Sequence, residues 1–539
     1  MNQGWSSVLL ASIVSSTIQA NDNTILKNFD PGFQLNQTLQ MQLYRQLVQK
    51  PEEQEQVVQK PDSNTEQSIE NDDITFFVKQ IKVNTSQIIP EQELNRLIQL
   101  YEQKILSMQQ LYQLITQINE KYAKQQCVVC RAFLLEQQIN DGVVEIQLIE
   151  GKTGQVHIEG NNHLKGNYII KRLPSLVQGQ VARLDELNRD LQWFNSSEDT
   201  HLTVTLQPGE HPYTTDYVVQ AKEPTRDELW LSADSQGYEA TGKYRLSAAY
   251  LLRNITGYGD KIDLNSTLSE GHYGFAINYM QPIMSNGLKL MLGHSSNALE
   301  AVQGVAKEIN LEGYSSSTHI GFVKPLVIEN TWKLQGQLEY RQLRSETEIL
   351  QQDWINDTIN TYHLGFNGHY LFDQSFLNFA SSLSYGKWKD ITQHVLDFST
   401  LHLNLMYSLP LNPKNTLQMR LNLQKSFNDN TPSSSKFSAT GYYATRGYDE
   451  GNFSSLSGGN LNLDYIYVLN HTLSMKLFSD LGWLDVSDDK LLMSVGTELE
   501  WQPIKNTYFA LQFATPIIRE VSDTKADAYT LHFKLYKTF

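Results

Sequence analysis

No stretch of the 539-residue chain approaches the roughly 18 consecutive apolar residues of a membrane-spanning helix. Only 40% of the residues are hydrophobic, and the mean hydropathy is −0.41. The chain is also too long for one compact domain. These limits leave a soluble multidomain protein, or a β-barrel whose alternating strands keep the apolar fraction low. The 27 tyrosines and 21 phenylalanines favour the barrel, because aromatic girdles line both membrane interfaces of such proteins.

Cysteine is nearly absent, since the chain has only Cys127 and Cys130, in the sequence Cys-Val-Val-Cys. A metal site needs about four ligands, and no second cysteine pair exists to complete one. A redox pair normally lies at a helix start in a thioredoxin-like unit, which the surrounding pattern lacks. We therefore favour a small structural disulfide, formed in an oxidising compartment, over a metal or redox site.

The chain has no excess of basic residues, and its formal charge of −16 argues against nucleic acid as a partner. It has no nucleophile elbow, phosphate-binding loop or metal-ligand spacing, and its 13 histidines are scattered. The sequence therefore predicts a protein that is not an enzyme and that needs no nucleotide, metal or other cofactor.

The first 20 residues resemble a secretory signal peptide that is cleaved after Ala20. They contain a short apolar stretch, although no lysine or arginine precedes it. No cysteine lies near Ala20, which excludes a lipoprotein anchor. Within residues 21–49, leucines spaced by four predict a helix from Phe33 to Gln49 with one narrow apolar stripe. This helix is too short and too polar to span lipid, and its polar faces suit the lumen of a channel.

Three further regions follow. Residues 50–73 are rich in Glu and Gln and have little to bury, so we expect a disordered linker. Residues 74–151 and 152–223 each show the order strand, helix, helix, strand, strand, which predicts two tandem α+β units. In the first unit, the helix that begins at Pro90 is expected to reach Ile105.

From residue 224 to 539 the helical period disappears and alternating strands follow one another. Leu417, Met419 and Leu421, for example, oppose Arg420 and Asn422 on the other face. The strands are longer than the 5 to 6 residues usual in soluble sheets, and charges recur on one face, as in a hydrated lumen. We count 16 such strands. The predicted fold is a 16-stranded antiparallel transmembrane β-barrel that follows two α+β units and a helix.

The last ten residues alternate and end on an aromatic residue. Phe533, Leu535 and Phe539 share one face, which is typical of the closing strand and assembly signal of an outer-membrane barrel. The aromatic residue often found two positions before the end is replaced by Lys537, so we expect weaker recognition by the assembly machinery.

The longest connection, residues 429–457, lies between the eleventh and twelfth predicted strands. It contains Arg446-Gly447-Tyr448, and the thirteenth strand carries Phe478-x-Asp480-x-Gly482. Alternation places those three strand residues in the lumen. With the leading helix, linker and tandem units, these motifs resemble the outer-membrane transporters of two-partner secretion, the haemolysin/filamentous-haemagglutinin secretion and activation family.

The resemblance implies that the tandem units are periplasmic POTRA domains and that the loop folds into the lumen, where Arg446 pairs with Asp480. It implies a pore in the outer membrane of a Gram-negative bacterium that exports, and in some cases activates, one unfolded exoprotein. Its other partners would be outer-membrane lipid and the barrel assembly machinery. The exoprotein is left open among adhesins, cytolysins, contact-dependent toxins and haem-binding proteins.

Two rival functions remain. A general assembly factor for outer-membrane proteins shares the loop motif, but it would typically carry more periplasmic units and lack the leading helix and linker. A passive porin would lack the periplasmic units altogether.

Overall fold

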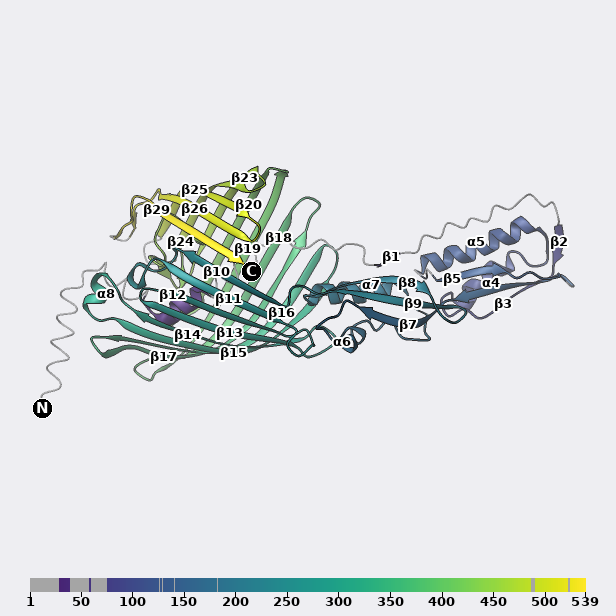
Figure 1. The fold of residues 1–539 in the computed structure, drawn as a ribbon, viewed down its shortest axis with the longest axis horizontal. Coiled ribbons are helices and arrows are strands. Elements are labelled where there is room, and N and C mark those ends of the chain that lie inside the picture. Colours follow the sequence, from purple (N-terminus) through teal and green to yellow (C-terminus); the bar gives the residue numbers. More distant parts are fainter. Residues whose placement is uncertain are drawn as a thin grey trace. The chain divides into compact units, whose positions relative to one another are not determined.

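The computed structural model describes residues 29–38, 58–59 and 75–539, apart from residues 126, 128, 140, 182, 486–489 and 522–523. The chain divides into two compact units, of which one comprises residues 54–224 and the other residues 1–53 with 225–539 (Figure 1). The predicted signal peptide lies outside the described residues. Within them, no helix combines the length and apolarity needed to cross a membrane.

The larger unit is a closed barrel of 16 antiparallel strands, as predicted from the sequence. The strand β29 pairs with both β26 and β10, which closes the sheet. The barrel strands are, in order, β10 (Asp227–Asp234), β11 (Arg245–Arg253), β12 (Lys261–Ser269), β13 (His272–Pro282), β14 (Lys289–Glu300), β15 (Glu312–Ile328), β16 (Trp332–Ile349), β17 (Gln352–Leu371), β18 (Phe376–Lys389), β19 (Val395–Asn412), β20 (Asn415–Ser426), β23 (Gly458–Asn470), β24 (Leu473–Leu484), β25 (Lys490–Ile504), β26 (Thr507–Pro516) and β29 (Thr530–Thr538).

Shorter elements lie between these strands in the same unit. They are η1 (Glu239–Thr241), α8 (Gly304–Glu308), η2 (Ser433–Ser435), β21 (Phe437–Ser438), β22 (Ser454–Ser455), β27 (Glu520–Val521) and β28 (Thr524–Lys525).

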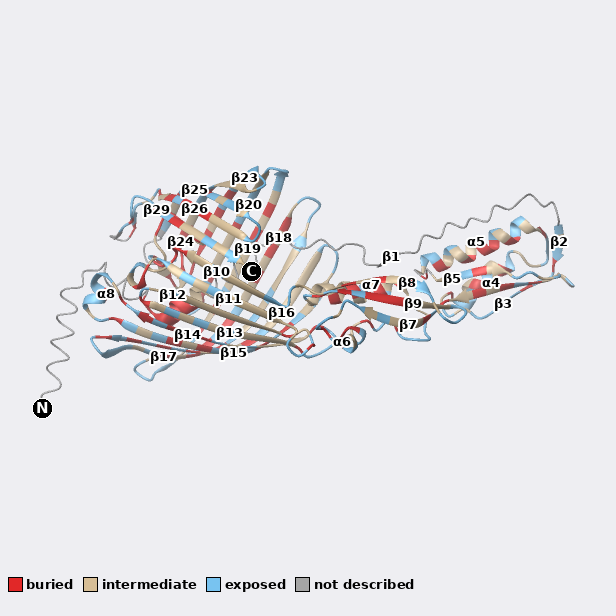
Figure 2. Cartoon of the chain, in the orientation of Figure 1, coloured by how far each residue is buried: buried red, intermediate tan, exposed pale blue. Residues whose placement is uncertain are grey.

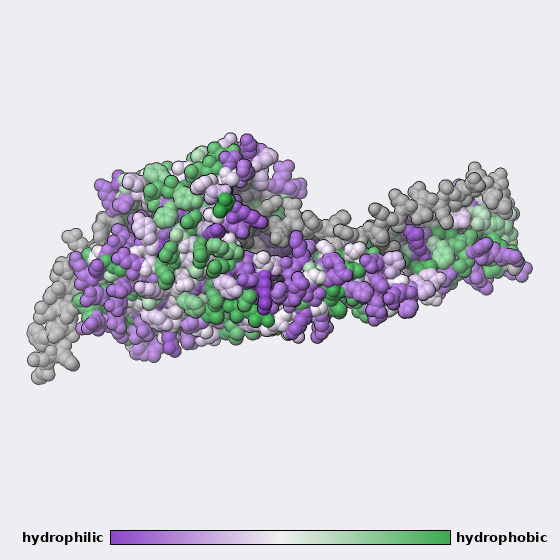
Figure 3. All heavy atoms as spheres, in the orientation of Figure 1, coloured by the Kyte–Doolittle hydropathy of each residue, from purple (hydrophilic) through white to green (hydrophobic). Residues whose placement is uncertain are grey.

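The alternation along each strand separates an apolar outer face from a polar inner face. One outward row crosses five adjacent strands, and all of its side chains are exposed: Phe322, Leu338, Leu364, Leu383 and Leu401. The neighbouring residues Glu339, Ser384 and Thr400 point inward and are buried. Figure 3 shows apolar side chains gathered over the barrel wall. This arrangement suits lipid outside and a hydrated interior.

The start of the N-terminal helix lies in the barrel lumen. Residues 31–38 are helical, so the helix begins at Pro31, two residues before the predicted start, which matches the preference of proline for a first helical turn. Leu35 packs on Leu343, Ile359 and Phe398, which belong to the inner faces of β16, β17 and β19. The rest of the predicted helix, residues 39–49, lies outside the described residues.

The first small α+β unit combines a three-stranded sheet, β3-β6-β5, with a separate pair, β2-β4. The predicted extension of the first helix to Ile105 is wrong. The helix ends at Gln99, Gln103 has a positive φ of 58° that breaks the helical path, and Ile105 lies in β4. The elements are β2 (Thr75–Val78), β3 (Gln80–Val83), α4 (Glu91–Gln99), β4 (Lys104–Ser107), α5 (Met108–Lys124), β5 (Cys130–Leu134) and β6 (Val143–Glu150).

The second small unit is a four-stranded sheet in the order β1-β8-β9-β7, with two helices. Strand β1 (Val58–Gln59) comes from the predicted disordered linker, so that expectation is wrong at these two residues. The other elements are β7 (Lys152–Glu159), α6 (Gly166–Ile170), α7 (Leu184–Ser197), β8 (His201–Pro208) and β9 (Thr214–Lys222). The apolar side chains of α7, β8 and β9 form the core, seen as the buried stripes in Figure 2.

Candidate functional site: the loop inside the barrel

The loop between β20 and β23 packs against the inner barrel wall. Asn460 and Asn462 of β23 donate side-chain hydrogen bonds to the carbonyl oxygens of Ala439 (2.8 Å) and Ala444 (2.7 Å). Both asparagines are buried, so these bonds give their side-chain nitrogens partners away from solvent. The loop backbone is therefore held by polar side chains that project into the lumen.

Arg446 is the most buried charged residue of this loop, with 2% of its surface exposed. Its Nε and Nη2 donate to the two carboxylate oxygens of Asp480, at 2.9 and 2.6 Å. Its backbone N–H also donates to Asp480, at 3.0 Å. The guanidinium lies 3.6 Å above the ring of Phe478. Such a two-pronged contact fixes the direction of the arginine as well as its charge.

Two further charged residues, which the sequence interpretation did not single out, complete the cluster. Nη2 of Arg446 lies 2.5 Å from Oδ1 of Asp464 on β23, and Asp464 also accepts from Arg420 on β20, at 3.0 Å. Asp464 could have been found by alternation, because its neighbours Leu463 and Tyr465 are exposed on the outer face. Nothing in the loop sequence indicated that one arginine would join two carboxylates.

The glycines of both motifs leave room for the loop. A Cβ on Gly447 would lie 2.7 Å from Cβ of Ser494, and one on Gly482 would lie 2.4 Å from Oγ1 of Thr445. Tyr448 donates a 2.6 Å hydrogen bond to the carbonyl of Ile518. The structure thus joins Arg446 of the loop motif to Asp480 and Phe478 of the strand motif, while Gly447 and Tyr448 contact residues outside that motif. The role of both motifs in transport stays a prediction.

The N-terminal helix region touches the same loop. Asp30 accepts hydrogen bonds from Ser345 of β16, at 2.6 Å, and from Ser433 of the loop. Asn36 donates to the carbonyl of Ser434, at 2.7 Å. The helix and the loop are therefore attached to each other as well as to the barrel wall.

The predicted assembly signal lies at the seam of the barrel. Leu535 and Phe539 are exposed on the outer face, and Phe533 stacks on Tyr244 with ring centroids 6.0 Å apart. The backbone N–H of Phe539 donates to the carbonyl of Leu229 of β10, at 2.9 Å. Its recognition during assembly stays a prediction.

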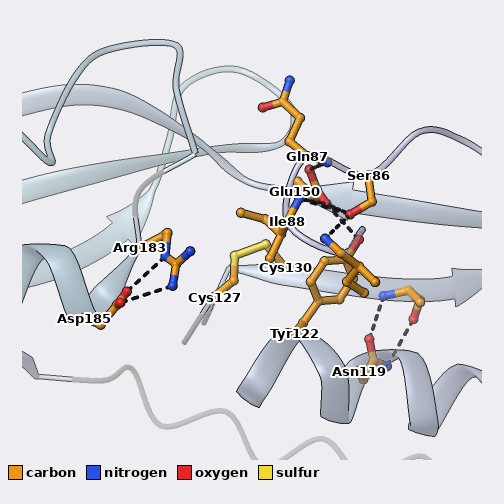
Figure 4. Close-up of a disulfide and its surroundings, with 12 residues drawn as sticks. Ser86, Gln87, Ile88, Asn119, Tyr122, Cys127, Cys130, Glu150, Arg183 and Asp185 are labelled. Atoms are coloured by element: carbon orange, nitrogen blue, oxygen red, sulfur yellow. Dashed lines mark hydrogen bonds and ion pairs between the residues drawn. A yellow bond between two sulfur atoms is a disulfide. The ribbon is translucent and has the colours of Figure 1, made fainter. Parts of the chain in front are cut away.

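Cys127 and Cys130 form a disulfide between α5 and β5 (Figure 4). Both are buried in the core of the first α+β unit. Nearby, the Glu150 carboxylate accepts hydrogen bonds from Tyr122, at 3.0 Å, and from the backbone N–H of Gln87, at 2.8 Å. Burial above all raises the pKa of the Tyr122 hydroxyl, so that group stays protonated and remains a donor.

Comparison with known proteins identifies the family. Residues 214–501 match the family of the haemolysin secretion/activation protein ShlB/FhaC/HecB, and residues 76–151 match the POTRA domain of ShlB type. The heme/hemopexin transporter protein HuxB of Haemophilus influenzae is 23% identical over 503 residues, covering 86% of this chain and 88% of HuxB. The outer membrane transporter CdiB of Dickeya dadantii is 21% identical over 220 residues, covering 41% and 38%.

Solved structures share the fold. CdiB from Escherichia coli superposes with a TM-score of 0.65 at 16% identity, covering 97% of this chain and 99% of that one. BamA from Haemophilus ducreyi, lacking its POTRA domains 1–3, gives a TM-score of 0.51 at 14% identity, covering 86% and 100%. By its barrel, its POTRA domain and its family match, the chain belongs to the ShlB/FhaC/HecB family of outer-membrane transporters for two-partner secretion.

Proposed function

We propose that this protein exports one dedicated exoprotein through its barrel, and that the loop held by Arg446 controls passage. The observation that carries the proposal is the contact of Arg446 with both Asp464 and Asp480 inside a closed barrel. A passive porin would lack the POTRA domains altogether. The family match and the similarity to HuxB over most of both chains favour a dedicated transporter over a general assembly factor.

The boundaries that best fit this function follow the sequence interpretation. Residues 1–20 act as the signal peptide, residues 21–49 carry the plug helix, and residues 50–73 link it to the POTRA domains. Those domains comprise residues 74–151 and 152–223, and residues 224–539 form the pore. The protein acts without a catalytic centre, because export here consists of binding and passage rather than bond making.

In the mechanism we propose, the client is captured by strand addition. An extended chain binds an exposed sheet edge through backbone hydrogen bonds, which requires no fixed client sequence. The POTRA sheets have such edges, and a client that has folded satisfies its own backbone groups and no longer binds. Affinity should be micromolar, because ordering a disordered chain costs several kcal/mol and the transporter must release its cargo.

The test is co-expression with the secreted protein encoded beside this gene, with export into the medium measured against a deletion strain. Calorimetry on the fragment of residues 74–223 then compares a client domain diluted from denaturant with the same domain after folding. Export that continues unchanged in the deletion strain contradicts the proposed function. Equal affinity for the folded and unfolded client contradicts strand addition while leaving export intact.

A further inference from the structure

One edge of the second POTRA sheet is occupied by a strand from the same chain. Strand β1 pairs in parallel with β8, with Val58 opposite Val204 and Gln59 opposite Thr205. On its other side, β8 pairs antiparallel with β9 along its whole length. The short strand β1 therefore pairs with two of the eight residues of β8.

The side chain of Asn195 hydrogen-bonds to the backbone on the outer edge of β8, as a neighbouring strand would. The Asn195 amide accepts from the backbone N–H of Leu202, at 2.7 Å, and donates to its carbonyl, at 2.9 Å. The polar groups of Leu202 therefore point away from β9. Because alternate residues of a strand point the same way, those of Val204 also face this outer edge, where β1 lies.

The first POTRA domain contains the same kind of asparagine contact, and no linker strand pairs beside it among the described residues. Asn119 of α5 accepts from the N–H of Ala132, at 2.7 Å, and donates to its carbonyl, at 3.3 Å. Figure 4 shows this amide beside β5. In both domains an asparagine thus closes the start of the edge strand. Among the described residues, a further strand pairs with the outer side of this strand only in the second domain, where β1 pairs with β8.

The linker sequence carries a matching signal. Val57 and Val58 are the only aliphatic residues between Val48 and Ile69, in a stretch dominated by Glu and Gln. β-Branched residues favour extended strands, and Pro51 and Pro61 flank the segment on both sides. The residues that pair with β8 therefore lie in the one segment of the linker whose composition favours a strand.

We infer that the outer edge of β8 is a docking edge for the extended client, and that β1 holds this edge until the client displaces it. The inference rests on the proposed export function. Because β1 is tethered, its local concentration is on the order of 1 mM, enough to exclude weak strands. A client that pairs along more of β8 replaces the two-residue ladder. The linker thus selects for long extended chains.

A reversible lock tests this inference in the full-length transporter. Gln59→Cys with Thr205→Cys, in a Cys127→Ser/Cys130→Ser background, joins β1 to β8 after mild oxidation. We expect secretion of the partner protein to fall more than tenfold on oxidation and to recover on reduction. A second variant, Gln59→Pro, removes an N–H from β1, and we expect it to bind the unfolded client about tenfold more tightly.

Matched controls separate the lock from general damage. Thr203→Cys with Gln220→Cys joins β8 to β9, which already pair at these positions, and it leaves the outer edge unchanged. This variant should secrete normally after oxidation. Normal secretion by the β1–β8 lock, or unchanged client affinity of Gln59→Pro, would overturn the inference while wild-type export continues. Failure of the wild type to export its partner would instead count against the proposed function.

Discussion

Arg446 joins carboxylates from two neighbouring strands to the loop, which hydrogen bonds from Asn460 and Asn462 also hold in the lumen. All three charged groups are almost fully buried. Removing one member of a buried ionic group costs about 3–5 kcal/mol, because the remaining charge loses its partner in a poorly solvated site. The contact therefore stabilises one position of the loop strongly, and its loss should weaken the attachment of the loop to the barrel wall.

At this scale we predict that Arg446→Ala and Asp480→Ala each impair secretion while the barrel still assembles. Arg446→Ala should be the more severe, because it removes the arginine partner of Asp480 and one of the two arginines that contact Asp464. The double variant should lose little more than Arg446→Ala, since both changes remove the same contact. A quantitative secretion assay with heat-modifiable barrel mobility as the folding check measures this, and additive losses would contradict it.

The control for this prediction is an ion pair on the surface. Lys425 and Asp485 lie 3.0 Å apart, but more than half of each side chain is exposed. Solvent screens such pairs, so Lys425→Ala should change secretion and stability very little. Arg446→Lys keeps the charge but loses the fork, and should secrete at an intermediate level.

The disulfide of the first POTRA domain is a second residue-level feature. It closes a loop of only a few residues, which predicts a stabilisation of about 2 kcal/mol through the unfolded state. Cys127→Ser with Cys130→Ser should lower the urea midpoint of the fragment of residues 74–223 by a corresponding amount. A reducing agent should destabilise the wild-type fragment equally, and it should leave the variant unchanged.

At the scale of elements, the N-terminal helix and the loop occupy the lumen together. Asp30 contacts both the barrel wall and the loop, and Leu35 packs on the apolar part of that wall. Several polar contacts and two small apolar clusters, around Phe29 and Leu35, hold residues 29–38. These contacts are far fewer than the backbone hydrogen bonds that hold a barrel strand in the sheet. The helix can therefore leave the lumen without opening the barrel.

We therefore predict that deleting residues 21–71 raises single-channel conductance in planar bilayers while secretion largely persists. Deleting residues 62–71 alone shortens the linker but keeps the helix, and it should leave the conductance near that of the wild type. Asp30→Ala should give an intermediate, noisier current, because one anchor is lost. Unchanged conductance in the longer deletion would show that the helix does not obstruct the pore.

At the scale of the whole molecule, the barrel depends on one seam between its first and last strands. Strands β10 and β29 pair over five residues, and Phe539 adds a backbone hydrogen bond beyond the end of β29. A closed barrel has no free edge, so the seam decides whether the sheet is complete.

Deletion of Phe539 should lower the amount of folded transporter in the outer membrane several-fold, because both the terminal aromatic residue and its hydrogen bond are lost. Lys537→Phe restores the aromatic residue two positions before the end and should raise that amount. Membrane fractionation with heat-modifiable mobility measures both. Equal levels in all three proteins would show that the C-terminus is not the signal.

Much of the architecture was predictable because the alternation of apolar and polar residues along a barrel strand shows which side faces lipid and which faces the lumen. The period of two identified the strands and the inner position of Asp480 and Phe478, and counting gave the number of strands. Local signals failed where the backbone leaves its regular path. The left-handed conformation of Gln103 ended the first helix early, and the pairing partner of Ile105 was a distant strand.

The sequence by itself determined the barrel, its inner and outer faces and the order of elements in the second α+β unit, because these follow from periodicity within short segments. Only the tertiary structure decided that Arg446 reaches Asp464 as well as Asp480, that Asp30 touches the loop, and that Val58 pairs with β8. Each of these contacts joins segments far apart in the chain. Such contacts depend on how the folded chain brings separate segments together, and no local sequence pattern specifies which segments will meet.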